Sequence, residues 1–309
     1  MSARAALTTR AALASVSAAT LLLALKSYAA WATGSVAMLG SLADTALDLL
    51  ASMVTLFAVR VAAQPADREH RFGHGKAEAL AALAQIVLIS ISAIGIGWRA
   101  IDRLIAHERT ANADYGIAVS VVAILVTFAL VAYQRSVVRR TGSVAIRTDN
   151  VHYQSDLLLN LSVIAALVLD QYAGFPSADP LFGLAIALWL MWGAWRASTQ
   201  ALDQLMDREW PDEKRMRFLA IASSRPEAKG IHDLRTRSSG THDFAQFHIW
   251  IDPEMSVAAA HEVVEAIEGD LAREFPGCEV LIHLDPEGQV DHPGNALLET
   301  DETKESIPK

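Results

Sequence analysis

Two pairs of metal-ligand residues are spaced four positions apart within apolar stretches of the chain. Asp44 and Asp48 form one pair, and His152 and Asp156 form the other. Because residues i and i+4 share one face of a helix, each pair presents two ligand groups to the same side. Two such helices packed together would offer three carboxylates and one imidazole around one point. This set of nitrogen and oxygen donors suits a divalent ion in tetrahedral coordination.

The cost of placing these groups in a membrane supports the same interpretation. Each carboxylate at the centre of a bilayer costs several kcal/mol on insertion scales, so three in one bundle need a cation, shared protons or water. The alternatives are a buried hydrogen bond for His152 and carboxylates that lie near helix ends. Both alternatives require two i,i+4 pairs of metal-ligand residues to arise independently without a role in metal binding.

A second cluster consists of Asp67, His70 and His74, between the second and third apolar stretches. Two histidines four residues apart, with an acid three residues before them, are able to hold a metal ion. Gly73 and Gly75 interrupt the run, so helical spacing does not follow from the sequence. A solvated loop is the alternative.

A third cluster lies in the C-terminal third of the chain. His283 and Asp285 are two apart in a strand-like run and therefore share a face of a strand. His232 and His248 lie in two earlier strand-like runs, which predicts a metal site across the strands with Asp285 able to bridge two ions. A surface role is the alternative for any single histidine. The whole cluster comprises His232, His242, His248, His261, His283 and Asp285.

The elements that must position these residues are membrane spans and a small α/β domain. Hydrophobic residues make up 52% of the 309-residue chain, and about 20 apolar residues suffice to cross a bilayer. The fifth predicted span carries many polar residues in its first half, so its polar side must face the bundle interior or water. The predicted spans are residues 10–33, 38–63, 77–105, 113–138, 144–170 and 178–206.

The distribution of basic residues predicts the orientation in the membrane. One side of the predicted bundle gathers ten Lys and Arg residues, and the other gathers Arg99, Arg103 and Arg109. The positive-inside rule then places both termini and the acidic tail in the cytoplasm. The ten are Arg4, Arg10, Arg60, Arg68, Arg71, Lys76, Arg135, Arg139, Arg140 and Arg147.

The region after the last span reads as a cytoplasmic domain over residues 207–287. The sequence predicts a helix at 212–224, paired strands at 231–238 and 243–251, a helix at 256–275 capped by Ser256, and a strand at 278–284. Residues 288–309 are polar and are predicted to be disordered. Cys278 is the single cysteine, so no internal disulfide forms. We interpret it as a small core residue, and a metal ligand is the alternative.

Charge argues against one class of partner. Residues 207–309 hold 22 Asp and Glu against 11 Lys and Arg, a net charge of −11. An acidic domain repels nucleic acid and suits a domain that attracts cations. Ordinary solubility charge is the alternative for most of these acids.

The chain resembles the cation diffusion facilitator family, in particular its bacterial zinc and iron efflux members. The matching runs are Gly-Ser-Leu-Ala-Asp-Thr-Ala-Leu-Asp at 40–48, His-Arg-Phe-Gly-His-Gly-Lys-Ala-Glu at 70–78 and His-Tyr-Gln-Ser-Asp at 152–156. The resemblance covers essentially residues 10–287.

The resemblance implies a homodimer of six-helix protomers, each with a cytoplasmic metallochaperone-like, ferredoxin-like domain. It implies a transport site and a loop site at the first two clusters described above. It further implies a two-metal site in the C-terminal domain formed by His232, His248, His261, His283 and Asp285. Lys76 and Asp207 match a charge pair at the domain junction, whereas His242 and His292 match no family role.

Together these features predict a transporter rather than an enzyme. We expect zinc efflux by proton antiport, because carboxylates and imidazole must lose protons to bind a metal ion. Zinc is expected both as the transported ion and as a structural or regulatory ion. Iron(II) and cadmium are alternative substrates, and a metal sensor without transport is an alternative function. A membrane metalloprotease is disfavoured, since no His-Glu-x-x-His occurs.

Overall fold

The computed structural model describes residues 3–33, 36–106, 117–173, 177–227, 229–240 and 242–287. The chain divides into two compact units, Met1–Asp203 and Gln204–Lys309, which we call the membrane unit and the C-terminal unit. Each is described by itself. The predicted disordered segment 288–309, with His292, and the loop residues 107–116, with Arg109, lie outside the described residues.

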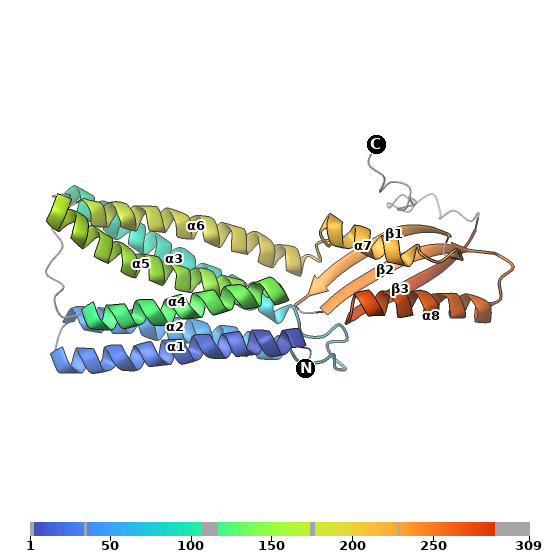
Figure 1. Cartoon of the computed structure of the whole chain (residues 1–309), viewed down its shortest axis with the longest axis horizontal. Helices are drawn as coiled ribbons and strands as arrows, with labels where there is room; N and C mark the ends of the chain where they lie inside the picture. The colour runs from blue at the N-terminus through green and yellow to red at the C-terminus, as the bar shows by residue number, and fades with distance from the viewer. Residues whose placement is uncertain are drawn as a thin grey trace. The chain divides into compact units, whose positions relative to one another are not determined.

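The membrane unit is a bundle of six long helices (Figure 1). Helix α1 packs on α2 and α4, α4 packs on α5, and α3 packs on α2 and α5. The helices are α1 (Ala3–Thr33), α2 (Val36–Ala62), α3 (Ala77–Ala106), α4 (Ile117–Thr141), α5 (Val144–Ala173) and α6 (Ala178–Leu205). Five of the helices agree with the predicted spans to within four residues at each end, whereas α1 begins seven residues before the predicted span 10–33.

Small residues allow α6 to approach its neighbours closely. A β-carbon at Gly183 would lie 3.3 Å from the Ala100 side chain of α3, and one at Gly193 would lie 3.2 Å from the Val151 side chain of α5. Close helix approach through small residues is the usual packing mode inside a bilayer.

Five described helices are long and apolar enough to cross a membrane: α1, α2, α3, α4 and α6. Helix α5 is equally long, at 30 residues, but the polar residues of its first half lower its hydropathy. Several of these residues, including Thr148, Asp149 and Ser155, are buried in the bundle. The expectation that the polar side of this helix faces the bundle interior is therefore confirmed for these residues.

The C-terminal unit is a three-stranded sheet covered by two helices on one face. Strands β1 (Lys229–Ser239) and β2 (His242–Ile251) form an antiparallel pair, and β3 (Cys278–Pro286) adds parallel to β2. Helix α7 (Asp212–Ala222) precedes the sheet, and α8 (Val257–Glu274) connects β2 to β3. Ser256 caps α8 as predicted, since its hydroxyl accepts the Ala259 N–H at 3.2 Å.

The core of this unit lies between the sheet and the helices. Phe247 and Ile249 of β2 pack with Phe218 of α7 and with Ile267 and Leu271 of α8. Because strand side chains alternate, the residues between these core positions point to the opposite face of the sheet. His248 lies between Phe247 and Ile249, so the sheet presents its histidines on the face away from the helices.

Candidate metal centres

The first candidate centre joins α2 to α5 inside the membrane unit. The Nε2 atom of His152 lies 3.0 Å from Oδ1 of Asp48 and 3.9 Å from Oδ2 of Asp156. Ligand atoms of these three residues lie within 4.8 Å of one another. Their side chains are 15%, 21% and 28% exposed for His152, Asp48 and Asp156, so ions have access to a largely enclosed site.

Asp44 does not join this group in the structure. It lies one helical turn before Asp48 on α2, and it is exposed. The structure thus brings together three of the four residues that the sequence paired.

A buried hydrogen-bond network surrounds Asp149 of α5, which precedes His152 by about one helical turn. Asp149 is fully buried and accepts hydrogen bonds from Ser15 at 2.7 Å, Gln134 at 2.7 Å and Gln85 at 3.1 Å. These donors come from α1, α4 and α3, so one carboxylate ties four helices together. Asp149 is one of the polar residues of the fifth predicted span, and the sequence analysis assigned it no separate role. Its i,i+3 spacing to His152 was the signal that could have placed it on the same helix face as the metal ligands.

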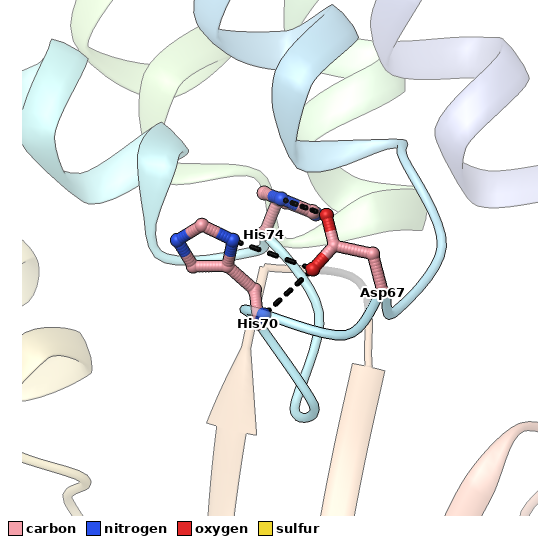
Figure 2. Close-up of side chains that lie close together, drawn as sticks. All are labelled: Asp67, His70 and His74. Atoms are coloured by element: carbon pink, nitrogen blue, oxygen red, sulfur yellow. Dashed lines mark hydrogen bonds and ion pairs between the residues drawn. The ribbon is translucent and has the colours of Figure 1, made fainter.

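The second candidate centre is the connection between α2 and α3. Figure 2 shows the Asp67 carboxylate facing both imidazoles from one side. Its Oδ2 lies 3.3 Å from His74 Nε2, and its Oδ1 lies 3.5 Å from His70 Nδ1. The two imidazole rings lie 4.5 Å apart. The segment is a turn and not a helix, because Gly73 adopts a positive φ of 78°. A loop fold therefore brings the three predicted residues together without helical spacing.

Backbone hydrogen bonds hold Asp67 in its ionised form. Its Oδ1 accepts the N–H groups of His70 at 2.6 Å and Glu69 at 2.9 Å. The bond from His70 is the largest cause and lowers the pKa of Asp67 below its ordinary value. Desolvation opposes this lowering of the pKa, and the bond from Glu69 adds to it. A deprotonated carboxylate is thus in place to bind a cation at neutral pH.

The third candidate centre follows from strand register in the C-terminal unit. His232 of β1 pairs with His248 of β2, and His248 pairs with His283 of β3. The rings of His232 and His248 lie 5.3 Å apart, and those of His248 and His283 lie 4.6 Å apart. Three histidines far apart in sequence therefore form one row across the sheet.

Asp285 completes this row. Its carboxylate lies 2.8 Å from His248 Nδ1, 3.4 Å from His232 Nε2 and 3.3 Å from His283 Nε2. Ligand atoms of His232, His248 and Asp285 lie within 4.8 Å of one another. The two carboxylate oxygens face different histidines, which is the arrangement that a bridging carboxylate requires.

The tautomer of His232 fits a metal ion at this centre. Nδ1 of His232 lies 2.8 Å from the Gly230 carbonyl, which only accepts, so Nδ1 carries the proton. In the neutral ring, Nε2 then directs a lone pair toward the Asp285 carboxylate. Two facing acceptors need a cation or a proton between them, and a hydrogen bond from the second ring nitrogen to a backbone carbonyl is usual for a metal-bound histidine.

Asp233 is a nearby acid that sequence reasoning missed. Its Oδ2 lies 3.8 Å from His248 Nε2, and its carboxylate also accepts two hydrogen bonds from Arg235. Asp233 has a positive φ of 49°, and the strand register shifts between His232 and Arg235. This bulge brings a residue that strand alternation would place on the other face toward the histidine row.

Three further residues named from the sequence lie apart from these clusters: His261, Asp207 and His242. His261 of α8 is exposed and pairs with Glu265 at 3.4 Å. Asp207 lies 3.5 Å from Arg237, within the C-terminal unit. The predicted pair of Lys76 with Asp207 joins the two units and stays a prediction. His242, for which no role was expected, is an exposed residue at the start of β2.

Comparisons with known proteins place both units in one family. The Cation efflux transmembrane domain matches residues 12–206, and the Cation efflux protein cytoplasmic domain matches residues 210–287. The Cation-efflux pump FieF of Cronobacter sakazakii is 44% identical over 294 residues, covering 93% of this chain and 98% of that protein. The FieF protein of Serratia proteamaculans is 46% identical over 276 residues, covering 89% and 92% respectively.

The matches among solved structures each cover about a quarter of this chain. A structure described as the zinc form of the putative zinc transporter CzrB is 34% identical, with a TM-score of 0.26, over 28% of this chain and 99% of that one. The metal-bound C-terminal domain of the CzcD transporter from Thermotoga maritima is 29% identical, with a TM-score of 0.25, over 26% and 99%. Because the family domains cover nearly all of the chain and the curated relatives align over nine-tenths of it, this multi-pass membrane protein belongs to the cation efflux family of cation transporters.

Proposed function

We propose that this protein exports zinc from the bacterial cytoplasm in exchange for protons. The observation that carries the proposal is the cluster of Asp48, His152 and Asp156 inside the membrane unit. It combines an imidazole nitrogen with carboxylate oxygens on two helices of a bundle whose other helices are apolar. A charged cluster of this kind is costly in a membrane unless it binds a cation or protons.

Proton exchange follows from the chemistry of these ligands. The Nε2 atom of His152 faces the Asp48 carboxylate at 3.0 Å, so without a metal ion the imidazole N–H donates to that carboxylate. A dication that binds the same nitrogen must displace this proton. Metal release to the outside then restores a site that takes up protons, and alternation of access turns this competition into antiport.

The donor set favours zinc among divalent ions. Imidazole with carboxylate suits zinc, and iron(II) and cadmium are close to it chemically, whereas an all-oxygen site suits manganese or magnesium. Iron(II) and cadmium are therefore the alternative substrates of the same transporter.

The other two centres serve regulation or assembly in this proposal. Asp67, His70 and His74 lie in a loop outside the helices. The histidine row lies in a unit in which the described residues after α6 include no candidate membrane span. We propose that metal bound at the row of His232, His248, His283 and Asp285 stabilises the C-terminal unit and a homodimer, with His261 recruited from outside the row. The Lys76–Asp207 pair is proposed to hold the junction between the units.

The proposed organisation follows the expected boundaries. Residues 1–206 form the transmembrane domain, and residues 207–287 form the cytoplasmic metal-binding domain. Ten basic residues against three support a position in the inner membrane with both termini in the cytoplasm.

Flux in proteoliposomes tests the proposal. Zinc uptake is measured with an internal zinc dye and proton movement with a pH dye, in competition with iron(II), cadmium and manganese. Wild-type protein is expected to move zinc with counterflow of protons, and Asp156→Ala is expected to abolish both. Asp102→Ala, which removes an exposed carboxylate from α3, is the matched control and should retain transport.

The flux assay also separates the alternatives. Zinc binding without flux in correctly inserted wild-type protein would favour the sensor over the transporter. Zinc flux without proton movement would refute antiport while leaving zinc transport standing. Near-normal zinc flux by Asp156→Ala would refute the assignment of the transport site.

A further inference from the structure

A groove of about 780 Å³ opens between α4, α5 and α6 on the membrane unit, away from the metal ligands. One end of the groove is basic and the other end is apolar. The basic end is lined by Arg135, Arg139 and Arg140, and the apolar part is lined by Phe128, Leu158 and Trp189.

The three arginines provide positive charge that the protein does not neutralise at the groove. Arg135 donates to the neutral side chain of Gln154 at 2.8 Å. None of the lining residues is an Asp or Glu. Across the described part of the chain, no carboxylate lies within ion-pair distance of these three arginines. The lining of the groove therefore carries a net positive charge, which suits an anion.

The apolar part of the groove faces the surroundings of the bundle. Phe128 is 62% exposed and Leu158 is 39% exposed, although both lie within helices of the membrane unit. Phe128 precedes Arg135 by seven residues on α4, which places it about 10 Å along the helix axis at 1.5 Å per residue. An anion site thus continues directly into an apolar channel, as an amphiphile would require.

The position of the arginines agrees with a headgroup site. All three lie in the last two turns of α4, where the apolar span Val121–Thr141 ends. Basic side chains at the end of a span lie at the level of lipid headgroups, and basic pockets between helices bind anionic headgroups.

We propose that this groove binds one anionic phospholipid of the surrounding membrane, with its phosphate at Arg135, Arg139 and Arg140 and an acyl chain along Phe128, Leu158 and Trp189. The inference does not depend on which ion is transported.

Native mass spectrometry of the full-length protein in neutral detergent tests the proposal. Phosphatidylglycerol and phosphatidylcholine with identical acyl chains are titrated separately, and the apparent dissociation constant of the first bound lipid is measured. Each basic residue near an anionic lipid strengthens binding by roughly fivefold. We therefore expect phosphatidylglycerol to bind at least tenfold more tightly than phosphatidylcholine.

Variants locate the site. The triple variant Arg135→Gln, Arg139→Gln, Arg140→Gln should lose this preference, and the corresponding triple Lys variant should retain it. The control is the double variant Arg99→Gln, Arg103→Gln, which removes two exposed arginines near the C-terminal end of α3, a helix that does not line the groove. This variant should also retain the preference. Size-exclusion chromatography verifies that each variant is folded.

Four results would overturn the proposal. They are equal binding of the two lipids by wild-type protein, an unchanged preference in the Gln triple variant, an equal loss in the Arg99 and Arg103 control, and loss in a folded Lys triple variant. Excess inorganic phosphate is the last arm. Displacement of the lipid by phosphate alone would show a simple anion site in place of a lipid site.

Discussion

Substitution of Gly230 by alanine tests how the C-terminal unit builds its histidine row. Gly230 has a positive φ of 49°, and a β-carbon there would overlap the ring of Trp250 on the neighbouring strand. A left-handed backbone costs a non-glycine residue roughly 1–2 kcal/mol. Overpacking against a ring that must move costs a further 1–3 kcal/mol or so. We therefore expect Gly230→Ala to lower the free energy of unfolding by about 2–5 kcal/mol.

Two other glycines of the same unit separate the backbone cost from the steric cost. Gly277 also has a positive φ, of 84°, but a β-carbon there meets nothing within 4 Å. Gly277→Ala should therefore show the backbone cost alone, about 1–2 kcal/mol. Gly269 lies at an exposed position of α8 with open space around it, so Gly269→Ala should stabilise the unit by up to about 1 kcal/mol.

Urea denaturation of a fragment comprising residues 204–309 measures these differences. The fragment contains the whole C-terminal core, and buried Trp210 reports unfolding by fluorescence. Chelator is present throughout, so that metal binding does not contribute to the free energy of unfolding. Equal destabilisation by Gly230→Ala and Gly277→Ala would refute the argument, because the contact with Trp250 would then have no effect.

The same variant has a consequence for metal binding. The Gly230 carbonyl accepts the Nδ1–H of His232 at 2.8 Å and so fixes the orientation of the imidazole. Loss of such a supporting hydrogen bond typically weakens metal affinity by about 10–100-fold. Zinc titration of the folded Gly230→Ala fragment should show a loss in this range, whereas Gly277→Ala should bind zinc as the wild type does.

The remaining predictions concern the transport site, the histidine row and the single cysteine. His152→Asp should lower the ratio of zinc flux to manganese flux, because an all-oxygen site favours harder ions; an unchanged ratio would count against selection at this position. His248→Ala with Asp285→Ala should lower the melting temperature of the C-terminal unit in zinc but not in chelator, and should slow zinc flux without abolishing it. Complete loss of flux in that folded double variant would instead show that the transported ion must bind at the row. Burial raises the pKa of Cys278 to about 11, so the thiol stays protonated at neutral pH and iodoacetamide should alkylate it about 100-fold more slowly than it does in urea. Similar rates in the folded and unfolded chain would refute this burial.

Much of the fold was accessible from the sequence because its determinants are local. Apolar stretches of sufficient length predicted the membrane helices, and two strand-like runs close together in the sequence predicted the β1–β2 hairpin. The cap at Ser256 was likewise readable, since a serine before an apolar periodic run needs no distant partner. The pair of His152 with Asp156 depends only on helical periodicity, which the chain itself fixes.

Contacts between distant segments were decided only by the tertiary structure. Strand register places His232, His248 and His283 in one row, and a bulge turns Asp233 toward it; no local pattern encodes either. Helix packing likewise surrounds Asp149 with donors from three other helices. The sequence by itself determined which residue types were present and which face of each element they share. Tertiary packing decided which of those faces meet, because the energies of burial and hydrogen bonding depend on partners that lie far apart along the chain.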